Sequence, residues 1–440
     1  MKENEVISAE RIRQVAAELN EQMLDFCARL IRVPSLPGEE GAVANIVQDE
    51  MVSLGYDEVF RDDWGNVVGL VHGTEDGPSI MYNGHMDVVT EGAVSEWTGY
   101  DPYGAAIDEA LVLNRDGSLE ELTEVMHGRG ASDMKCGLGA QIYTGAALVR
   151  LKREGVSWKG SFILAAVVLE ENAEMMGTIK LTEETFSKRG IRVDAMVSAE
   201  PSSLDLKLGH RGRLELKITV YGKSCHGSSP WLGVNAVEKA APLITAIRTL
   251  FDAKTTEDIH LGRPGITLTI IDCEPAALCI VPDRCHLTYD CRLIPGETVT
   301  GAIAEIQALI DDMHAKDPCF NAGIAINSSV RHAYTGLYEE IESQKEVWII
   351  DREHPFIRAC AAGLTEVGQE VRYGYWAFST DIPQLGSVMK KPCVGYSGGQ
   401  EYYIHNGTEK IRLDYLKMSL EGNIAIFLKA SELPLDSFHV

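Results

Sequence analysis

Residues 161–171 read SFILAAVVLEE, an apolar run that ends in two adjacent glutamates. Such a run is typical of a strand buried on both faces, as in a parallel sheet covered by helices. Two carboxylates at the end of a buried strand repel each other and are costly unless a cation or a shared proton compensates them. We therefore interpret Glu170 and Glu171 as candidate functional residues, with a solvated strand end as the alternative interpretation.

The segments around this strand alternate between two periodicities. Apolar residues recur at three- and four-residue steps where helices are expected, and short β-branched runs indicate strands. We predict helices over residues 8–31, 40–54 and 137–153, and further strands over residues 66–71, 79–83 and 195–198. Interleaved strands and helices predict an α/β domain whose sheet is covered by helices.

The pattern changes after Glu200-Pro201. We predict strands over 213–221, 265–271, 284–293 and 323–330, and helices over 234–251 and 299–316. This order indicates a small helix-on-sheet module. From His354 onward helix and strand alternate again, with a strand near 391–395 and a final helix over 413–428. The sequence thus predicts a smaller α+β domain inserted into a larger α/β domain.

Two glycine-containing segments supply further candidates. Asn83-Gly84-His85-Met86-Asp87 follows an apolar strand, and an Asp two residues after a metal-binding His is well placed to hold its other ring nitrogen. Alone, this pattern also fits a polar strand end. The segment Gly128–Gly137 delivers Asp133 to the start of a predicted helix, where a single Asp could instead be a helix cap.

Two more candidates come after predicted strands or in turns. Glu200 follows the strand at 195–198, and His405 lies in the turn-rich segment 398–406. Open α/β sheets bind their ligands at the carboxyl ends of strands, where these residues gather. Together the candidate ligands offer mixed nitrogen and oxygen donors suited to two zinc ions or similar metals: His85, Asp133, Glu171, Glu200 and His405.

Composition narrows the function classes. The chain has 440 residues, 45% hydrophobic content and a formal net charge of -25, which favours two domains and disfavours binding to nucleic acid or an anionic membrane. The ten cysteines form no C-x-x-C pair, so we expect a reducing, cytoplasmic location. No stretch approaches the ~20 apolar residues of a membrane span.

These motifs, in this order from about Leu24 to the C-terminus, resemble the M20 metallopeptidases, which include acetylornithine deacetylase, succinyl-diaminopimelate desuccinylase, aminoacylase and the glutamate carboxypeptidases. Within the family, three segments are similar to the branch called selenium-metabolism-linked hydrolases: Gly212–Glu215, Ser224–Ser228 and Trp376–Thr380.

The resemblance implies a role for each candidate residue. One metal ion would be bound by His85, Asp133 and Glu200. The other would be bound by Asp133, Glu171 and His405, so that Asp133 bridges the pair. Asp87 would orient His85, and Glu170 would be the general base that takes a proton from the metal-bridging water and hands it to the leaving amine. We expect two divalent ions, zinc first, with cobalt or manganese as alternatives.

The resemblance also implies a catalytic domain over residues 1–207 and 335–440, interrupted by a lid and dimerisation domain over 208–334. We call residues 208–334 the lid. His226 matches a lid histidine that enters the active site of the other subunit of a homodimer and stabilises the oxyanion. Arg292 matches a lid arginine that holds a substrate carboxylate. An ordinary strand-end histidine and a surface ion pair are the alternatives. Where many relatives have an asparagine, this chain has Cys279, which cannot supply that amide.

The expected function is therefore hydrolysis of an amide bond in an N-acyl amino acid or a short peptide. A dipeptidase or carboxypeptidase would use the same site, and the difference would lie in lid and pocket contacts. A non-catalytic metal-bound or peptide-binding protein of the same fold is the third alternative. Such a protein would be free to lose the base or a ligand, whereas all of them are present here.

Overall fold

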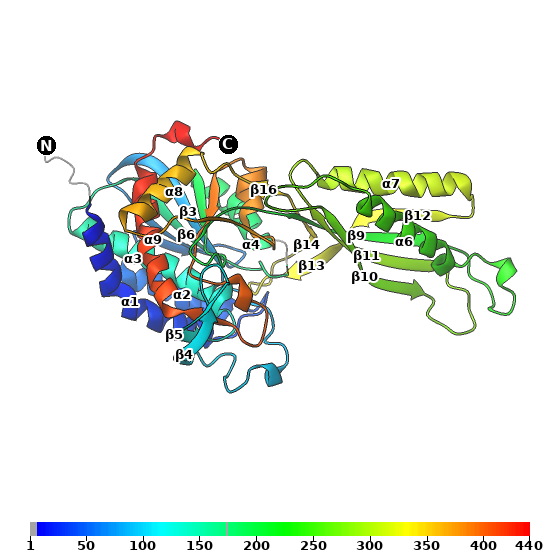
Figure 1. Ribbon diagram of the computed structural model, residues 1–440, viewed down its shortest axis with the longest axis horizontal. Coiled ribbons are helices and arrows are strands. Elements are labelled where there is room, and N and C mark those ends of the chain that lie inside the picture. Colours follow the sequence, from blue (N-terminus) through cyan, green and yellow to red (C-terminus); the bar gives the residue numbers. More distant parts are fainter. Residues whose placement is uncertain (1–6, 173–174) are drawn as a thin grey trace.

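The computed structural model describes residues 7–172 and 175–440. It shows a large body that holds both the first and the last described residues, and an elongated extension containing β9 to β12, α6 and α7 (Figure 1). Apolar residues form a separate core in each part. The core of the extension draws on residues between Leu214 and Phe320, all within the predicted lid. The domain boundaries at 208 and 334 stay a proposal.

The large body is built on a mixed sheet. Among the described residues its strands follow the order β1-β2-β6-β3-β7-β18-β8-β16, with β17 paired to β8. Strands β6, β3, β7 and β18 are parallel neighbours. The strands are β1 (Glu58–Arg61), β2 (Val67–His72), β3 (Glu75–His85), β6 (Lys159–Val167), β7 (Ala195–Ser198), β8 (Leu206–His210), β16 (Trp348–Ile349), β17 (Tyr373–Trp376) and β18 (Cys393–Gly395).

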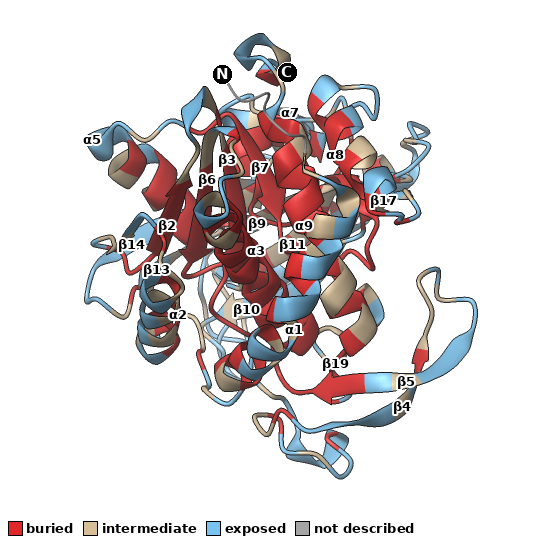
Figure 2. Cartoon of the chain, turned by 90° about the vertical axis from the view of Figure 1, so that its left-hand side faces the viewer, coloured by how far each residue is buried: buried red, intermediate tan, exposed pale blue. Residues whose placement is uncertain are grey.

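Helices cover this sheet. Helices α3 and α9 pack on the central strands β3 and β6, and α1 packs across both helices. Figure 2 shows α3 and the strands beneath it as largely buried. The helices are α1 (Ala9–Ile31), α2 (Gly41–Leu54), α3 (Cys136–Arg153), α4 (Met176–Lys180), α5 (Ser187–Arg189), α8 (Pro355–Glu366) and α9 (Leu413–Ser431). Helix α1 begins at the Ser8 cap, whose side chain accepts a hydrogen bond from the Arg11 backbone N–H.

The extension has an antiparallel sheet in the order β10-β11-β9-β12, with β15 also paired to β9. Along β9, even-numbered residues such as Leu216 and Ile218 are buried, while odd-numbered residues lie on the other face. Helices α6 and α7 pack against this sheet. The elements are β9 (Gly212–Tyr221), α6 (Ala236–Asp252), β10 (Gly265–Glu274), β11 (Arg284–Leu293), α7 (Val299–Lys316), β12 (Asn321–Ile326) and β15 (Gln344–Lys345).

Two small sheets complete the chain. Strands β13 (Ser328–His332) and β14 (Tyr338–Glu342) form a hairpin near the junction of the two parts (Figure 1). Strands β4 (Ile107–Leu113), β5 (Glu120–His127) and β19 (Lys410–Arg412) form a sheet at the edge of the large body, where β4 is mostly exposed and β5 is exposed at its start and buried at its end (Figure 2).

The predicted fold class, a mixed α/β sheet interrupted by a smaller α+β domain, is confirmed. Strands β7 and β11 and helix α7 have the predicted bounds. One prediction is wrong in detail, because residues 323–330 do not form one strand. The chain leaves β12 at Ile326 and enters β13 at Ser328, in a different sheet.

Candidate metal centre

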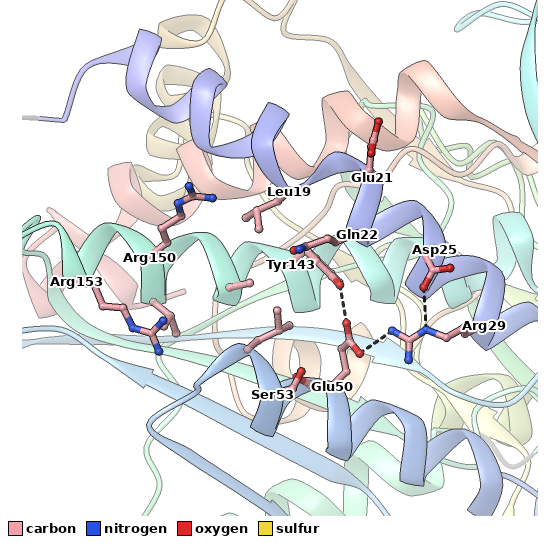
Figure 3. A pocket seen from close by; sticks show the side chains of 13 residues that line it. Leu19, Glu21, Gln22, Asp25, Arg29, Glu50, Ser53, Tyr143, Arg150 and Arg153 are labelled. Carbon is pink, nitrogen blue, oxygen red and sulfur yellow. Dashed lines mark hydrogen bonds and ion pairs between the residues drawn. The ribbon is translucent and has the colours of Figure 1, made fainter.

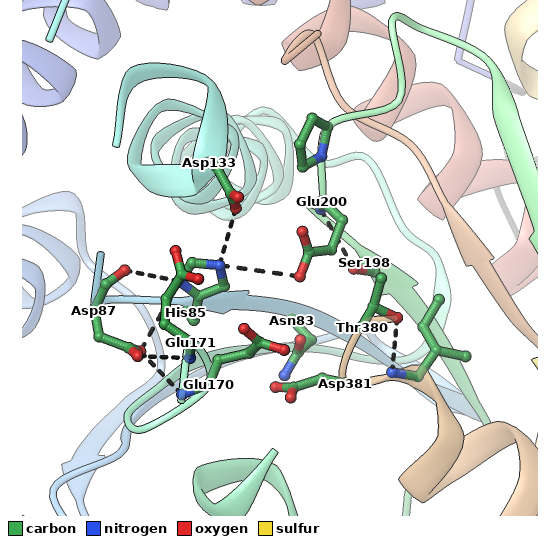
Figure 4. A network of polar contacts seen from close by, with 12 residues as sticks. Asn83, His85, Asp87, Asp133, Glu170, Glu171, Ser198, Glu200, Thr380 and Asp381 are labelled. Carbon is green, nitrogen blue, oxygen red and sulfur yellow. Dashed lines mark hydrogen bonds and ion pairs between the residues drawn. The ribbon is translucent and has the colours of Figure 1, made fainter. Parts of the chain in front are cut away.

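The candidate site begins at the carboxyl ends of three neighbouring parallel strands. His85 is the last residue of β3, Glu170 and Glu171 follow β6, and Glu200 follows β7. In the parallel ladders His85 is opposite Val167 and Asn83 is opposite Ser198, so the three strands end at one level. Figure 4 shows these side chains converging above the sheet. The sequence therefore placed these candidates at the correct edge.

Asp133 reaches the same place from the turn 131–135 that precedes α3. The backbone N–H groups of Ser132 and Asp133 both donate to Glu409 Oε1 at 3.0 Å. Glu409 in turn forms a buried ion pair with Arg129. A buried carboxylate that accepts two backbone N–H bonds and pairs with a guanidinium fixes the turn. Glu409 therefore holds the main chain of Asp133 while the Asp133 side chain projects into the site.

The two oxygens of Asp133 face two different histidines. His85 Nε2 lies 3.2 Å from Asp133 Oδ1, and His405 Nε2 lies 3.1 Å from Asp133 Oδ2. On the His85 side, Nε2 is also 3.9 Å from Glu200 Oε1. On the His405 side, Nε2 is also 3.2 Å from Glu171 Oε2. The site therefore has two halves that share one carboxylate, each with a histidine and a glutamate of its own.

The hydrogen bond on the far side of His85 sets its tautomer. Nδ1 lies 2.8 Å from the backbone carbonyl oxygen of Asp87, which can only accept, so Nδ1 carries the proton and Nε2 presents a lone pair in the neutral ring. That lone pair points toward Asp133 and Glu200, which are both acids. A cation between them satisfies all three groups.

The sequence suggests that the Asp87 side chain holds the other ring nitrogen of His85, but the main-chain carbonyl of Asp87 makes that contact instead. Strand β3 ends at His85, so the alternation of side chains does not extend to Asp87. Its carboxylate lies 3.9 Å from His85 Nδ1, whereas it accepts hydrogen bonds from the backbone N–H groups of Glu170 at 3.2 Å and Glu171 at 2.9 Å. Asp87 therefore orients His85 through its main chain and fixes the two glutamates through its side chain.

The charges of the site fit divalent cations. Burial, followed by the nearby Asp133 carboxylate, raises the pKa of Glu171 to about 7, and burial also raises the pKa of Glu200 well above its usual value. Contacts with Asp133 and then Glu171 raise the pKa of His405 to about 11. Glu171 Oε1 is buried and has no hydrogen-bond partner among the described residues. Grouped acids with an orphaned oxygen and two histidines make a donor set suited to zinc-type ions.

Proximity alone also allows another grouping of the ligands. One cluster of potential donor atoms joins His85, Asp133 and Glu171, and a second joins His85, Glu170 and Glu200, with all atoms of a cluster within 4.8 Å of one another. Glu170 is thus close enough to be considered a ligand. However, its carboxylate is already paired with Lys345, whose Nζ lies 2.7 Å from Glu170 Oε1.

A cavity of about 340 Å³ is lined by lid residues and, on its catalytic side, by the acids of the site and His405, namely Asp133, Glu170, Glu171, Glu200 and His405. Arg292, the lid arginine suggested by the family resemblance, lines it together with Arg213, which was not among the candidates from the sequence. The two arginines are directly opposite each other on β11 and β9, and Lys345 on β15 is opposite Arg213. Three cationic side chains therefore form one row across three strands at the end of the lid sheet that joins the large body, which we call the root of the lid.

The positive charges of the two arginines in this row are paired with acidic side chains of the lid sheet. Arg292 donates to Asp290 at 2.7 and 3.0 Å, and Arg213 pairs with Glu215 and lies 3.6 Å from Asp290. Glu215 and Asp290 are one side-chain step further from the junction and do not line the cavity. Both arginines therefore line the cavity while they are paired with acids that do not line it.

His226 is not part of this cavity. It is exposed in the lid, where its Nδ1 accepts a hydrogen bond from the Ser228 backbone N–H at 3.1 Å. Cys279 is exposed in a neighbouring loop, which contacts the His226 turn through the backbone. Within one chain, the structure does not bring His226 to the metal centre.

A larger hollow of about 760 Å³ lies elsewhere, between α1, α2 and α3 (Figure 3). Its Arg29 is paired with Asp25 and Glu50, and the Tyr143 hydroxyl donates to Glu50. These contacts bind the helices to one another, so size alone does not identify the functional site.

Comparison with known proteins shows which proteins this chain is similar to in sequence and fold. Residues 208–318 match the peptidase dimerisation domain of the M20 peptidases. The chain is similar to the uncharacterized protein YgeY of Escherichia coli strain K12, with 29% identity over 401 residues that cover 91% of this chain and 92% of that protein.

Solved structures with the same fold span nearly the whole chain. Human carnosine dipeptidase 1 superposes with a TM-score of 0.68 at 15% identity, covering 97% of this chain and 99% of that one. The M20 family metallo-carboxypeptidase Sso-CP2 of Sulfolobus solfataricus gives 0.67 at 17% identity, covering 94% and 100%. The Bacillus subtilis YXEP protein, a dinuclear metal binding peptidase from the M20 family, gives 0.60 at 14% identity, covering 93% and 98%.

Two further findings follow. The resemblance to the M20 family is confirmed by the dimerisation domain and by the fold, while the narrower branch stays a prediction. In residues 7–172 and 175–440, the structure has no helix long and apolar enough to span a membrane.

Proposed function

The chain carries the dimerisation domain and the fold of the M20 metallopeptidases, and from this premise we propose that it is a dinuclear metal-dependent amidohydrolase. Its substrate is an N-acyl amino acid or a short peptide. The observation that supports this most directly is the position of Asp133, whose two carboxylate oxygens face His85 and His405 on opposite sides. A carboxylate shared in this way is suited to bridging two cations.

The proposal assigns each half of the site to one ion. His85 and Glu200 would hold the first with Asp133, and His405 and Glu171 would hold the second. Two divalent cations bound there would polarise the scissile carbonyl and make a water molecule acidic enough to attack it near neutral pH. Zinc suits this donor set, and cobalt or manganese would also be accommodated.

Glu170 supplies the proton transfers. Burial acts to raise the pKa of Glu170, but the charges of Lys345 and His85, together with the hydrogen bond from Lys345, outweigh burial and lower that pKa below its usual value. Glu170 is therefore a carboxylate at neutral pH. It accepts the proton of the attacking water and then donates it to the leaving nitrogen, as a general base followed by a general acid.

The lid side of the cavity indicates the type of substrate. Arg213 and Arg292 face the cavity together, and a guanidinium binds a carboxylate with two parallel hydrogen bonds. A cavity of about 340 Å³ is of a size for a small ligand. We therefore place the free carboxylate of an N-acyl amino acid or dipeptide against these arginines, with the scissile amide at the metal centre.

A dipeptidase or carboxypeptidase is the second candidate, because such enzymes share the fold and would use the same arginines for a C-terminal carboxylate. A non-catalytic metal-bound protein is a third reading. The complete set of ligands and the paired, buried Glu170 argue against it.

We further propose a homodimer formed through the lid. The matched dimerisation domain and the exposed position of His226 support this arrangement. In such a dimer His226 would enter the site of the other subunit, where a preplaced donor stabilises the oxyanion. The scattered, unpaired cysteines fit a reducing cytoplasm.

A substrate screen tests the function. Purified protein loaded with zinc or manganese is incubated with N-acetyl-, N-succinyl- and N-carbamoyl-L-alanine, and with L-alanyl-L-alanine and L-alanyl-L-alanine amide. Released amine is then measured. We expect turnover of at least one substrate with a free carboxylate, lost after chelation and regained with metal. Absence of turnover across the panel with fully loaded protein would favour the non-catalytic reading.

A further inference from the structure

The general base proposed above is tied to a lysine on β15, the short strand that follows the lid in the sequence and pairs with lid strand β9. Lys345 Nζ lies 2.7 Å from Glu170 Oε1, and the two side chains are only 5% and 8% exposed. Lysine is rarely buried unless it is paired, since removing an ammonium from water costs several kcal/mol. A contact of this kind beside a reacting group therefore calls for a functional explanation.

Lys345 follows the lid in the sequence, and its strand is part of the lid sheet. It lies on β15, which pairs with β9 opposite Arg213. Three residues later, Trp348 is buried in the large body, where β16 pairs with β8. Lys345 is thus on the strand that leads from the lid back into the large body. Its main chain is held by the lid sheet while its side chain reaches Glu170.

The main chain of Glu170 is fixed, and Lys345 acts on the remaining freedom of its side chain. The Glu170 backbone N–H donates to Asp87 Oδ1 at 3.2 Å. The glutamate side chain still has three rotatable bonds. The Lys345 ammonium restricts them by donating a hydrogen bond to Oε1 at the end of the side chain. A carboxylate has about four lone-pair sites on its two oxygens. Oε2 therefore stays available for the proton transfer while Oε1 is held.

We propose that Lys345 is a positioning residue that holds the Glu170 carboxylate in place for proton transfer. This inference rests on the assignment of Glu170 as the general base. It also gives a physical reason for Lys345 at the lid root, because the lid sheet and the base are then joined by one side chain. Lys345 needs no contact with the substrate to act in this way.

The test combines three changes at this pair. Lys345→Met removes the charge and keeps the length of the side chain, Lys345→Arg keeps the charge, and Glu170→Gln removes the base. The matched control is Lys207→Met, which removes another buried lysine, paired with Glu401 at 2.6 Å and outside the cavity. The substrates are N-acetyl-L-alanine and L-alanyl-L-alanine, and metal content and thermal unfolding are measured for every variant.

We expect Lys345→Met to lower kcat by about 10- to 100-fold, the scale of a misplaced catalytic group, with KM and metal content near the wild-type values. Lys345→Arg should recover most of the rate, and Lys207→Met should keep it. The double variant Glu170→Gln/Lys345→Met should be no slower than Glu170→Gln alone, because Lys345 acts through Glu170. This comparison stays informative even if Lys345→Met is less stable.

Three results would overturn the inference. These are a wild-type kcat for Lys345→Met, a loss confined to KM, and a double variant whose loss is the product of the two single losses. Failure of the proposed function gives a different result, since either the wild-type protein would not hydrolyse these substrates or Glu170→Gln would itself retain activity.

Discussion

Replacing Glu170 by Gln separates the base from the metal ligands. The amide cannot accept the proton of the attacking water, so we expect kcat to fall by about 10²- to 10⁴-fold, the range for a lost general base. At 1.36 kcal/mol for each factor of ten, this corresponds to about 2.7 to 5.4 kcal/mol of activation free energy. The metal content should not change, because Glu170 is assigned no ligand bond.

Glu170→Gln should lower the free energy of unfolding by less than the loss of a buried ion pair usually does. Breaking a buried ion pair by removing one partner costs about 3–5 kcal/mol. Here the Gln amide oxygen can still accept a hydrogen bond from Lys345 Nζ, which lies 2.7 Å from Oε1 in the native pair. We therefore expect a loss of unfolding free energy below that range, which thermal or urea unfolding would measure.

Glu171→Gln is the matched control, with the adjacent residue and the same chemical change. Because Glu171 Oε2 faces His405 at 3.2 Å and its other oxygen is buried without a hydrogen-bond partner among the described residues, this variant should bind the second metal ion more weakly. The assay is elemental analysis after dialysis, together with kcat at saturating metal. Metal loss in Glu170→Gln and full metal content in Glu171→Gln would refute these assignments. Glu170 would then be the metal ligand and Glu171 the general base.

Three further predictions concern the rest of the site. His405→Ala should lose one metal equivalent and keep the other, since His405 serves only one half of the site; loss of both in elemental analysis would contradict two separable halves. Mixing inactive Glu170→Gln with inactive His226→Ala under subunit exchange should restore part of the activity, because a mixed dimer has one site with both native residues. If activity does not return although exchange is demonstrated, His226 does not act across a dimer. Arg292→Met and Arg213→Met should raise KM about 10- to 100-fold for L-alanyl-L-alanine, from about 1.5–3 kcal/mol for a charged hydrogen bond, while hydrolysis of the amide-capped dipeptide should change little; equal losses for both substrates would show that the arginines do not bind a carboxylate.

The sequence located the parts of the site that lie at strand ends. Long apolar runs identify β3, β6 and β7, and a residue directly after such a run must emerge at the edge of the sheet. Local patterns therefore indicated that His85, Glu170, Glu171 and Glu200 lie at the edge of the sheet, while the role expected of each came from the family resemblance. The strand-pairing registers then show these ends at one level.

Long-range contacts could not be predicted in this way. Lys345 lies 175 residues from Glu170 along the chain, in a polar segment whose short strand gives no periodic signal. Glu409, 276 residues from Asp133, is equally remote. Arg213 alternates with buried leucines as any outward-facing strand residue does, and only the pairing of β9 with β11 shows that it stands opposite Arg292.

The exposed hairpin of β4 and β5 was missed for a different reason. Its strands contain acids and threonine between the apolar residues, and much of it is exposed. The half-buried alternation that identifies a strand is therefore weak in this segment.

The most direct test of the central claim is anomalous diffraction from a crystal of the zinc-loaded protein. We predict two zinc peaks, one on each side of Asp133. Each should lie at the ~2.0–2.2 Å expected for a carboxylate ligand from a different Asp133 oxygen, with His85 and Glu200 around one and His405 and Glu171 around the other. A single peak bound by all five ligands, or zinc bound away from Asp133 at full loading, would contradict the account.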